Sequence, residues 1–424
     1  MSDQVSGRVS VIVPAYNHAP YVRECIDSAL SQTYPDVEVV VVDDGSTDGT
    51  YEILQTYGDR ITLIRQENAG TQAARNTAIR ASTGEFLALL DSDDMWLPEK
   101  LEKQIPLFGD PQVGLVHSLA YSRPENAGYA PEVATIGAPL PDGSDPFESL
   151  LLRNTIPALT AVWRRGCPGR SPDCFDETFV GVSDLELWLG IALLWRIVCV
   201  PEPLAVYRTH ASNTTKRLHD LRLAYAERRG LLEKVRTRNE GRLSTAAWDR
   251  VTASAELAGA ESAALALDPV ECAEYAFRAY CLAPGWVIAT GQFDRILAVV
   301  AHLREPAEDW LPVISFAETL FAAFSPTDRV IRQVRNAIMG ELWLAETIWR
   351  DDQRSRLSRL AALVRTLRFE PRYAANGGAL SVAGELVFGQ RLMSHFRPAA
   401  RRLLRSMPSR AGTGQGIPES RESV

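Results

Sequence analysis

The pattern of hydrophobic and polar positions changes along the chain. In its first quarter, short runs of mostly apolar residues alternate with stretches in which apolar residues recur every three or four positions. The runs lie at residues 9–14, 37–42, 61–66 and 86–90, and the helical spacing occurs at 21–30, 51–57, 71–81 and 97–105. Nearly continuous apolar strands separated by helices are typical of a sheet covered on both faces. The pattern predicts an α/β domain with a doubly wound, mostly parallel sheet.

The later part of the chain has a different texture. A segment rich in Pro, Gly and Asp at 122–145 predicts a loop, followed by strand-like runs at 158–163, 197–200 and 204–207 and a helix at 184–195. From about residue 217 the chain is rich in Ala, Leu, Glu and Arg with helical periodicity, and strand patterns almost vanish. We therefore expect an α/β domain at 1–215, a mainly α-helical domain at 216–370, and a basic helix with a disordered tail at 371–424.

Composition excludes some classes of protein. The chain is 46% hydrophobic and 23% charged, as is usual for a globular protein. Its net charge of -8 speaks against a nucleic-acid partner, which would need a broad basic face. The six cysteines are scattered without CxxC pairs, so reduced thiols are expected.

The sequence also bears on location. Residues 1–8 are polar and lead directly into a strand-like run, unlike a signal peptide, and no apolar stretch is long enough to span a bilayer. We expect a cytoplasmic protein. Peripheral membrane contact stays open, because a basic run (Arg397, Arg401, Arg402 and Arg405) stands beside apolar residues, although a solvated helix end also explains that run.

Polar residues gather directly after three of the predicted strands. These segments are 14–17 (PAYN), 43–48 (DDGSTD) and 91–94 (DSDD), and ligands of open parallel sheets bind at such strand ends. Turn chemistry accounts for Ser46, Thr47 and Asp48. Asp91 and Asp93 repel one another unless a cation joins them, and a divalent cation bound there could neutralise a diphosphate. Neither a G-x-G-x-x-G fingerprint nor a phosphate loop is present, which disfavours those modes of nucleotide binding.

Four segments carry a family resemblance. Residues 9–17 (VSVIVPAYN), 39–50 (VVVVDDGSTDGT), 68–76 (NAGTQAARN) and 84–98 (GEFLALLDSDDMWLP) resemble, in order and spacing, the motifs of the inverting family 2 glycosyltransferases. The resemblance continues weakly through 159–165 and 183–210 and ends near residue 215. It implies a GT-A fold for about half of the chain and implies nothing for the helical half.

The resemblance also implies roles for individual residues. The nucleotide sugar would be bound by Pro14, Ala15, Tyr16, Asp44, Asp91 and Ser92, with Asp44 facing the base and Asp91 the ribose. Asp93, the last residue of the DXD motif, would hold Mn or Mg, and His210 could join the metal or the diphosphate, although a lone His is more often structural. Arg75 could reach the crevice as a cation or lie on an exposed helix face.

Asp184 matches the catalytic base of the family. An acceptor hydroxyl must lose its proton as it attacks the anomeric carbon, and a carboxylate can accept that proton. Asp184 could also cap its helix, with or without acting as the base. Ser183 stands where family members commonly have Glu, which puts acceptor handling in doubt, and Glu186 is the next candidate for the base.

Together these features predict an inverting, metal-dependent glycosyltransferase of polysaccharide biosynthesis. A UDP-sugar is favoured as the sugar donor, and the acceptor could be a glycan, a lipid-linked glycan or a protein. The alternatives are a catalytically weak nucleotide-sugar-binding or scaffold protein, and a sugar-nucleotide pyrophosphorylase, which usually has a Gly-rich basic loop after its first strand. The helical half could bind a protein partner or a second copy of the chain.

Overall fold

A computed structural model describes residues 5–124, 134–167, 174–211, 213, 223–290, 296, 311–324, 327–329, 331–336, 338 and 339. The chain divides into two compact units. The first comprises Met1–Ala266 with Arg278–Thr290, and the second comprises Leu267–Phe277 with Gly291–Val424. The predicted segment at 371–424, with its basic run, lies outside the described residues.

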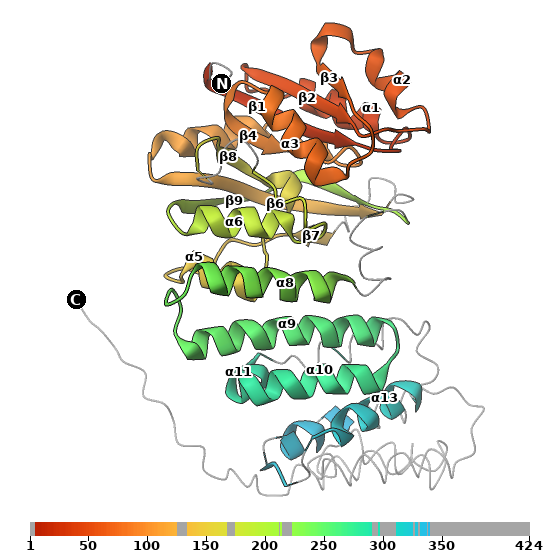
Figure 1. Ribbon diagram of the computed structural model, residues 1–424, viewed down its shortest axis with the longest axis vertical. Coiled ribbons are helices and arrows are strands. Elements are labelled where there is room, and N and C mark those ends of the chain that lie inside the picture. Colours follow the sequence, from red (N-terminus) through yellow and green to blue (C-terminus); the bar gives the residue numbers. More distant parts are fainter. Residues whose placement is uncertain are drawn as a thin grey trace, which may run out of the picture. The chain divides into compact units, whose positions relative to one another are not determined.

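A nine-stranded mixed sheet forms the centre of the first unit in the described part of the chain (Figure 1). The strands are β1 Val5–Ala15, β2 Val37–Asp43, β3 Thr62–Arg65, β4 Gly84–Leu89, β5 Met95–Trp96, β6 Val113–Pro124, β7 Ala134–Ile136, β8 Val162–Arg164 and β9 Arg196–Thr209. Their order is β3-β2-β1-β4-β8-β6-β9-β5, and β7 pairs with β6. The predicted α/β class is confirmed.

The sheet is less uniformly parallel than the sequence predicts. Strands β1 to β4 pair in parallel, as do β6 and β9, whereas β8 runs antiparallel to β4 and β6. Strand β6 has no counterpart among the predicted strands, because the buried polar residues His117 and Ser118 interrupt its apolar pattern. The two short runs predicted at 197–200 and 204–207 form one strand, β9, whose pairing with β6 shifts register near Pro203.

Helices cover both faces of the sheet. Helices α1 Val22–Leu30, α2 Thr50–Gln55 and α4 Lys100–Gln104 contribute to the core on one face, and α3 Thr71–Ala81, α5 Pro146–Leu152 and α6 Ser183–Ala192 contribute to the core on the other. The later helices are α8 Leu223–Arg238, α9 Thr245–Leu265, α10 Pro269–Leu282, α11 Pro284–Ala289 and α13 Leu311–Ala322. Short 3₁₀ turns occupy Gly58–Arg60, Ile105–Gly109 and Ala158–Thr160. None of the helices among the described residues has the length and apolar composition that a bilayer crossing requires.

The continuous apolar strands of the sequence reflect two cores, one on each face. Alternate residues of a strand point to opposite faces. Val40 and Val42 of β2 therefore pack in the core that includes Ala74 of α3, while Val39 and Val41 pack in the core that includes Ile26 of α1. A strand buried on both sides needs apolar residues at every position.

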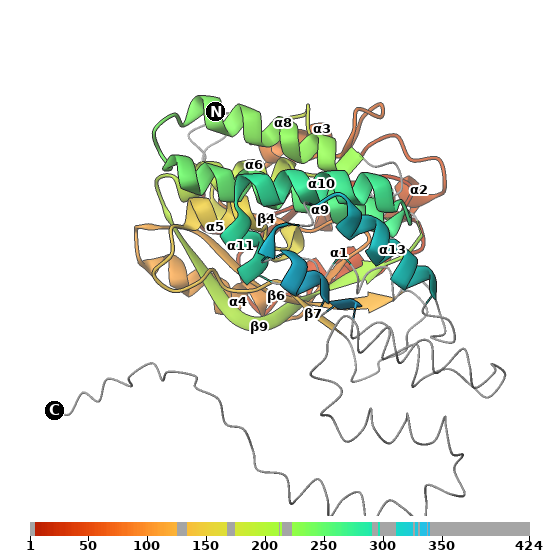
Figure 2. The same ribbon diagram turned by 90° about the horizontal axis from the view of Figure 1, so that it is seen from below.

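Helices α8 and α9 belong to the first compact unit. They run alongside one another, and in Figure 1 α8 lies between α6 and α9 (Figure 1, Figure 2). Leu231 and Val235 of α8 and Trp248 and Val251 of α9 are buried in the core that also contains Trp188 of α6. The compact unit thus continues past residue 215, where the sequence pattern places the domain boundary.

Candidate active site

The loop after β1 is tied to the loop after β2. Asn17 adopts a left-handed conformation with φ of 53°. Its side-chain oxygen accepts a hydrogen bond of 2.8 Å from the Thr47 amide, and its own amide donates to the Ser46 hydroxyl at 3.0 Å. These contacts fix the backbone directly after Tyr16, whose side chain is exposed, whereas Ala15 is buried in the strand. The predicted nucleotide-binding segment Pro14, Ala15 and Tyr16 therefore ends at an ordered turn with an exposed aromatic ring.

The Asp44 carboxylate accepts hydrogen bonds from the loop that precedes α3. Its Oδ1 accepts hydrogen bonds from the Gln66 side chain at 2.7 Å and the Ala69 amide at 2.9 Å, and its Oδ2 accepts one of 2.9 Å from the Gly70 amide. Asp44 is buried. The carboxylate that the resemblance places at the nucleotide base thus also holds the loop that precedes α3.

Arg75 reaches the end of β4. Its guanidinium lies 2.6 Å from the Asp91 carboxylate, and the arginine is buried while Asp91 stays partly exposed. A second nitrogen of Arg75 donates to the Gln72 side chain at 3.2 Å. Arg75 therefore does not lie on an exposed helix face, and its guanidinium pairs with the first aspartate of the DXD motif.

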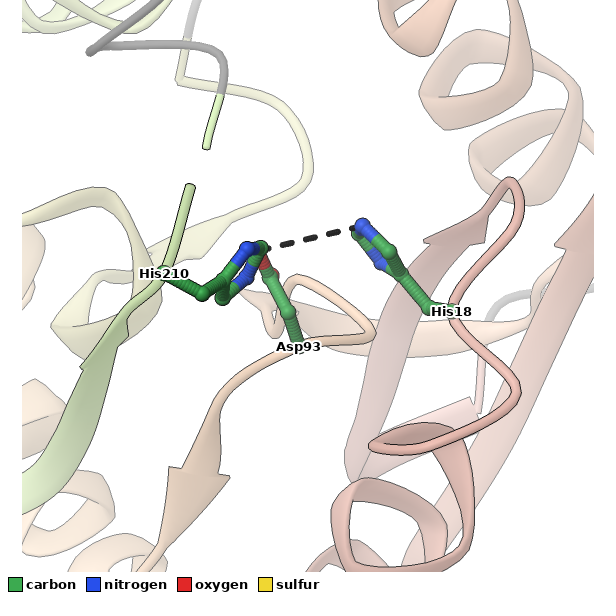
Figure 3. A group of neighbouring side chains, drawn as sticks. All are labelled: His18, Asp93 and His210. Carbon is green, nitrogen blue, oxygen red and sulfur yellow. Dashed lines mark hydrogen bonds and ion pairs between the residues drawn. The ribbon is translucent and has the colours of Figure 1, made fainter. Parts of the chain in front are cut away.

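A carboxylate and two imidazoles meet beside this pair. The Asp93 carboxylate lies 3.0 Å from Nε2 of His210 and 3.9 Å from Nε2 of His18 (Figure 3). One ligand atom from each of the three residues lies within 4.8 Å of the others, so the group could hold a metal ion. His210 comes from the end of β9, and His18 from the loop after β1. The expected closeness of Asp93 and His210 is seen, whereas His18 is absent from the sequence-based prediction.

Neighbouring side chains hold the imidazoles in place. Nδ1 of His18 lies 2.7 Å from the Ser92 hydroxyl, so Ser92 contacts a candidate metal ligand directly. The Tyr21 ring stacks on His210 with centroids 4.7 Å apart. The Asn213 side chain donates to Asp93 at 3.3 Å and accepts a bond of 2.6 Å from the His210 amide. Such outer contacts orient ligands before a metal binds.

Asp94 lies beneath the cluster and supports β9. It is buried and accepts a hydrogen bond of 2.9 Å from the Arg208 amide. Burial, together with the nearby charges of Asp93 and Asp91, raises the pKa of Asp94 well above its ordinary value. A proton on Asp94 would lower the repulsion among the three carboxyl groups.

Asp184 lies in the first turn of α6, whose N-cap residue is Val182. Its Oδ1 accepts a bond of 2.7 Å from the Leu185 amide, and its Oδ2 accepts one of 3.3 Å from Asn154. Burial raises the pKa of Asp184, and the charges of Arg75 and Asp91 also act on it. Asp184 therefore satisfies a free amide of its helix and lies within electrostatic range of the DXD motif.

Glu186, the alternative candidate for the base, forms ion pairs with two residues of α8. It is buried, and its carboxylate lies 2.9 Å from Lys234 and 3.6 Å from Arg238, both on α8. Both ion pairs hold the Glu186 carboxylate against α8.

The fold and site define an α/β protein with a cluster of carboxylates and imidazoles at the carboxyl ends of its parallel strands. The sequence comparisons identify this class. The family model described as glycosyl transferase family 2 matches residues 10–162. Residues 10–162 of this chain therefore form a glycosyl transferase family 2 domain.

Named relatives agree with this assignment. An uncharacterized glycosyltransferase of Rickettsia typhi is 33% identical over 221 residues, which cover 49% of this chain and 65% of the relative. The putative teichuronic acid biosynthesis glycosyltransferase TuaG of Bacillus subtilis is 40% identical over 156 residues, which cover 35% of this chain and 58% of TuaG. The chain thus spans less than two thirds of the length of these relatives.

A solved structure also resembles this chain. The crystal structure of S. aureus TarS 1-349 matches with a TM-score of 0.43 and 19% identity, covering 90% of this chain and 92% of TarS 1-349. The family assignment rests on the sequence matches.

Proposed function

We propose that this protein is an inverting glycosyltransferase that moves a sugar from a nucleotide diphosphate sugar, with a UDP-sugar as the favoured donor, to a glycan or lipid-linked acceptor. The observation that carries the proposal is the cluster of Asp93, His18 and His210 at the strand ends of a family 2 domain, beside the pair of Asp91 and Arg75. The name of the relative TuaG supports a polysaccharide acceptor.

The residues of this cluster fit a divalent metal. One carboxylate and two imidazoles suit Mn²⁺ better than Mg²⁺, which prefers an all-oxygen octahedral shell. A metal bound there would supply positive charge next to the diphosphate leaving group. Asp93, His210 and His18 are the proposed ligands, Tyr16 and Asp44 the proposed edge of the nucleotide site, and Asp91 with Arg75 the proposed ribose and phosphate side.

The proposed reaction needs a base on the acceptor side. The acceptor oxygen forms a bond to the anomeric carbon, the bond from that carbon to the diphosphate oxygen breaks, and its electron pair leaves with the diphosphate. The acceptor proton passes to the Asp184 carboxylate. Burial raises the pKa of Asp184, which makes it a stronger base than an exposed carboxylate.

A donor screen tests the proposal. The protein would be heated with UDP-glucose, UDP-galactose, UDP-N-acetylglucosamine or GDP-mannose, with and without Mn²⁺, because a ligand bound only by the native state raises the melting temperature. Nucleoside diphosphate release would be followed in the same samples with water as acceptor. We expect a Mn²⁺-dependent rise and slow hydrolysis with one of the four sugar donors. A binding or scaffold protein would give the rise without hydrolysis, and the absence of both would contradict the proposal.

A further inference from the structure

The segment that leads into α6 and Asp184 is held from two sides. From α3, the Gln72 side chain donates a hydrogen bond of 2.8 Å to the Val180 carbonyl. From α8, the Glu227 carboxylate accepts hydrogen bonds from the Val180 amide at 3.0 Å and the Gly181 amide at 2.5 Å. Two successive backbone amides of this segment thus depend on one side chain of α8.

Hydrophobic packing does not explain the position of these last residues. Earlier in the segment, Phe175 and Phe179 are buried in the core. The Val180 side chain, in contrast, is 44% exposed, and Gly181 is exposed as well. Val182, the N-cap residue of α6, has no side-chain oxygen that could accept a bond from the helix. The hydrogen bonds to Glu227 and Gln72 are therefore the contacts that fix the chain directly before the helix.

Hydrogen bonds and ion pairs hold helix α8 against neighbouring helices of the first unit. Arg228, the next residue after Glu227, donates to the carbonyls of Leu151 at 2.6 Å and Leu152 at 3.2 Å. Nearly two turns further along α8, Lys234 pairs with Asp176 and with Glu186. Since α8 is anchored to both α5 and α6, Glu227 can impose a defined position on the segment that it holds.

The same segment is connected to the sugar-donor side of the site. Gln72, which holds Val180 from the other side, accepts a hydrogen bond from Arg75, and Arg75 pairs with Asp91. The position of the chain before Asp184 is thus set by contacts to α8 on one side and to the DXD motif on the other. Glu227 lies outside the residues that the family model matches.

We propose that Glu227 is a positioning residue for Asp184: it fixes the start of α6 so that the Asp184 carboxylate stands where the acceptor proton is released. This inference rests on the proposed function. A misplacement of about 1 Å can cost about 100-fold in rate. Loss of both hydrogen bonds in Glu227→Ala should therefore lower the rate by about 10- to 100-fold and leave UDP affinity within about twofold, because Glu227 makes no contact with Asp44, Asp91 or Asp93 in the described contacts.

The test uses the full chain, Mn²⁺ and the sugar donor selected by the screen, with single-turnover hydrolysis as the rate. Glu227→Gln keeps the shape of the side chain but replaces one acceptor oxygen with an amide donor, so a smaller loss is expected, and this variant serves if Glu227→Ala fails to fold. Arg228→Met is the matched control: it also weakens the seating of α8 but leaves the bonds to Val180 and Gly181 intact. It should lower the melting temperature and keep the rate per folded molecule. Hydrogen exchange at Val180 and Gly181 should accelerate in the Glu227 variants alone.

A double variant separates this inference from the proposed function. If Glu227 acts through Asp184, adding Glu227→Ala to Asp184→Asn should change the residual rate by less than about twofold, because the effects of coupled residues are not additive. A full additional loss in the double variant, or a normal rate in Glu227→Ala, would overturn the positioning role alone. A normal rate in Asp184→Asn would instead overturn the proposed base.

Discussion

The two sides of the proposed site are built differently. The sugar-donor side consists of short segments at the ends of strands: hydrogen bonds tie Asn17 to the loop after β2, and Asp44 holds the loop that precedes α3. The base side is one segment at the start of α6, whose position depends on Gln72 of α3 and Glu227 of α8. The first side is built on the sheet, and the second needs a helix that follows the family domain.

This difference indicates which parts of the chain nucleotide binding requires and which parts sugar transfer requires. A nucleotide site made of strand ends requires only the sheet. A base held by α8 requires that helices beyond residue 215 stay packed on the domain, as Leu231 and Val235 do. Changes in the helical part should therefore affect transfer before they affect nucleotide binding.

The largest effect is expected from truncation. The sequence pattern predicts a domain boundary near residue 215, yet α8 and α9 contribute Leu231, Val235 and Val251 to the core. Each such buried side chain stabilises the fold by about 1.5–3 kcal/mol, and the loss of three of them approaches the whole stability of an ordinary domain. A chain ending at residue 218 should be unfolded or insoluble, and one ending at Thr290 should be folded. Circular dichroism and melting curves of the two truncated chains decide this, and a cooperatively melting shorter chain would show that the halves are separable.

Asp184→Asn should have the next largest effect. The change keeps the size of the side chain and its hydrogen bond to Leu185 but removes its basicity, which typically costs about 10²- to 10⁴-fold in rate. UDP affinity should be unchanged. The wild-type rate should also rise with pH, because the base must be ionised. The midpoint of this rise should lie above pH 3.8, the ordinary carboxyl pKa, because burial raises the pKa of Asp184. Near-normal transfer with a lowered melting temperature would leave Asp184 as a residue that only stabilises the helix.

The pH dependence of stability should come partly from His117, which is buried in β6. Burial lowers the pKa of His117 to about 4 from its ordinary value of 6.5. The unfolded chain takes up a proton near pH 6.5 and the folded chain does not, so stability falls between about pH 6.5 and 4 by about 3 kcal/mol. Urea melts at both pH values should show this loss in the wild type and a smaller one in His117→Met. Equal losses in both proteins would mean that groups other than His117 cause the loss of stability at low pH. The same measurement shows over which pH range the protein stays folded, which the pH profile of the rate assigned to Asp184 requires.

The smallest effect is expected from a substitution of His18, the candidate metal ligand that lies farther from Asp93. His18 is farther from Asp93 than His210 is, so His18→Ala should weaken Mn²⁺ binding by about 10-fold and leave Mg²⁺ binding nearly unchanged. Titration calorimetry or the electron paramagnetic resonance signal of free Mn²⁺ measures this without turnover. Tyr16→Phe, in the same loop but without a candidate ligand, is the control. Unchanged Mn²⁺ affinity would remove His18 from the ligand set.

Sequence reasoning named Asp44, Asp91 and Asp93, because they stand in contiguous motifs directly after apolar strands, and the structure places them at the ends of β2 and β4. It missed His18, although a histidine two residues after Tyr16 at the same sheet edge is a usable signal. It could not reach Glu227, whose role exists only through contact with a segment 46 residues earlier. It also missed β6, since polar residues buried inside a sheet look like a loop when neighbours are unknown.

The most direct test of the central claim is UDP binding measured by titration calorimetry, with and without Mn²⁺, in the wild type and in Asp93→Ala. The cluster of Asp93, His18 and His210 predicts that Mn²⁺ tightens UDP binding by the wild type by about 10-fold or more and has no effect on the variant. UDP affinity that is independent of Mn²⁺ in the wild type, or equally dependent on it in Asp93→Ala, would contradict a metal-assisted sugar-donor site at this cluster.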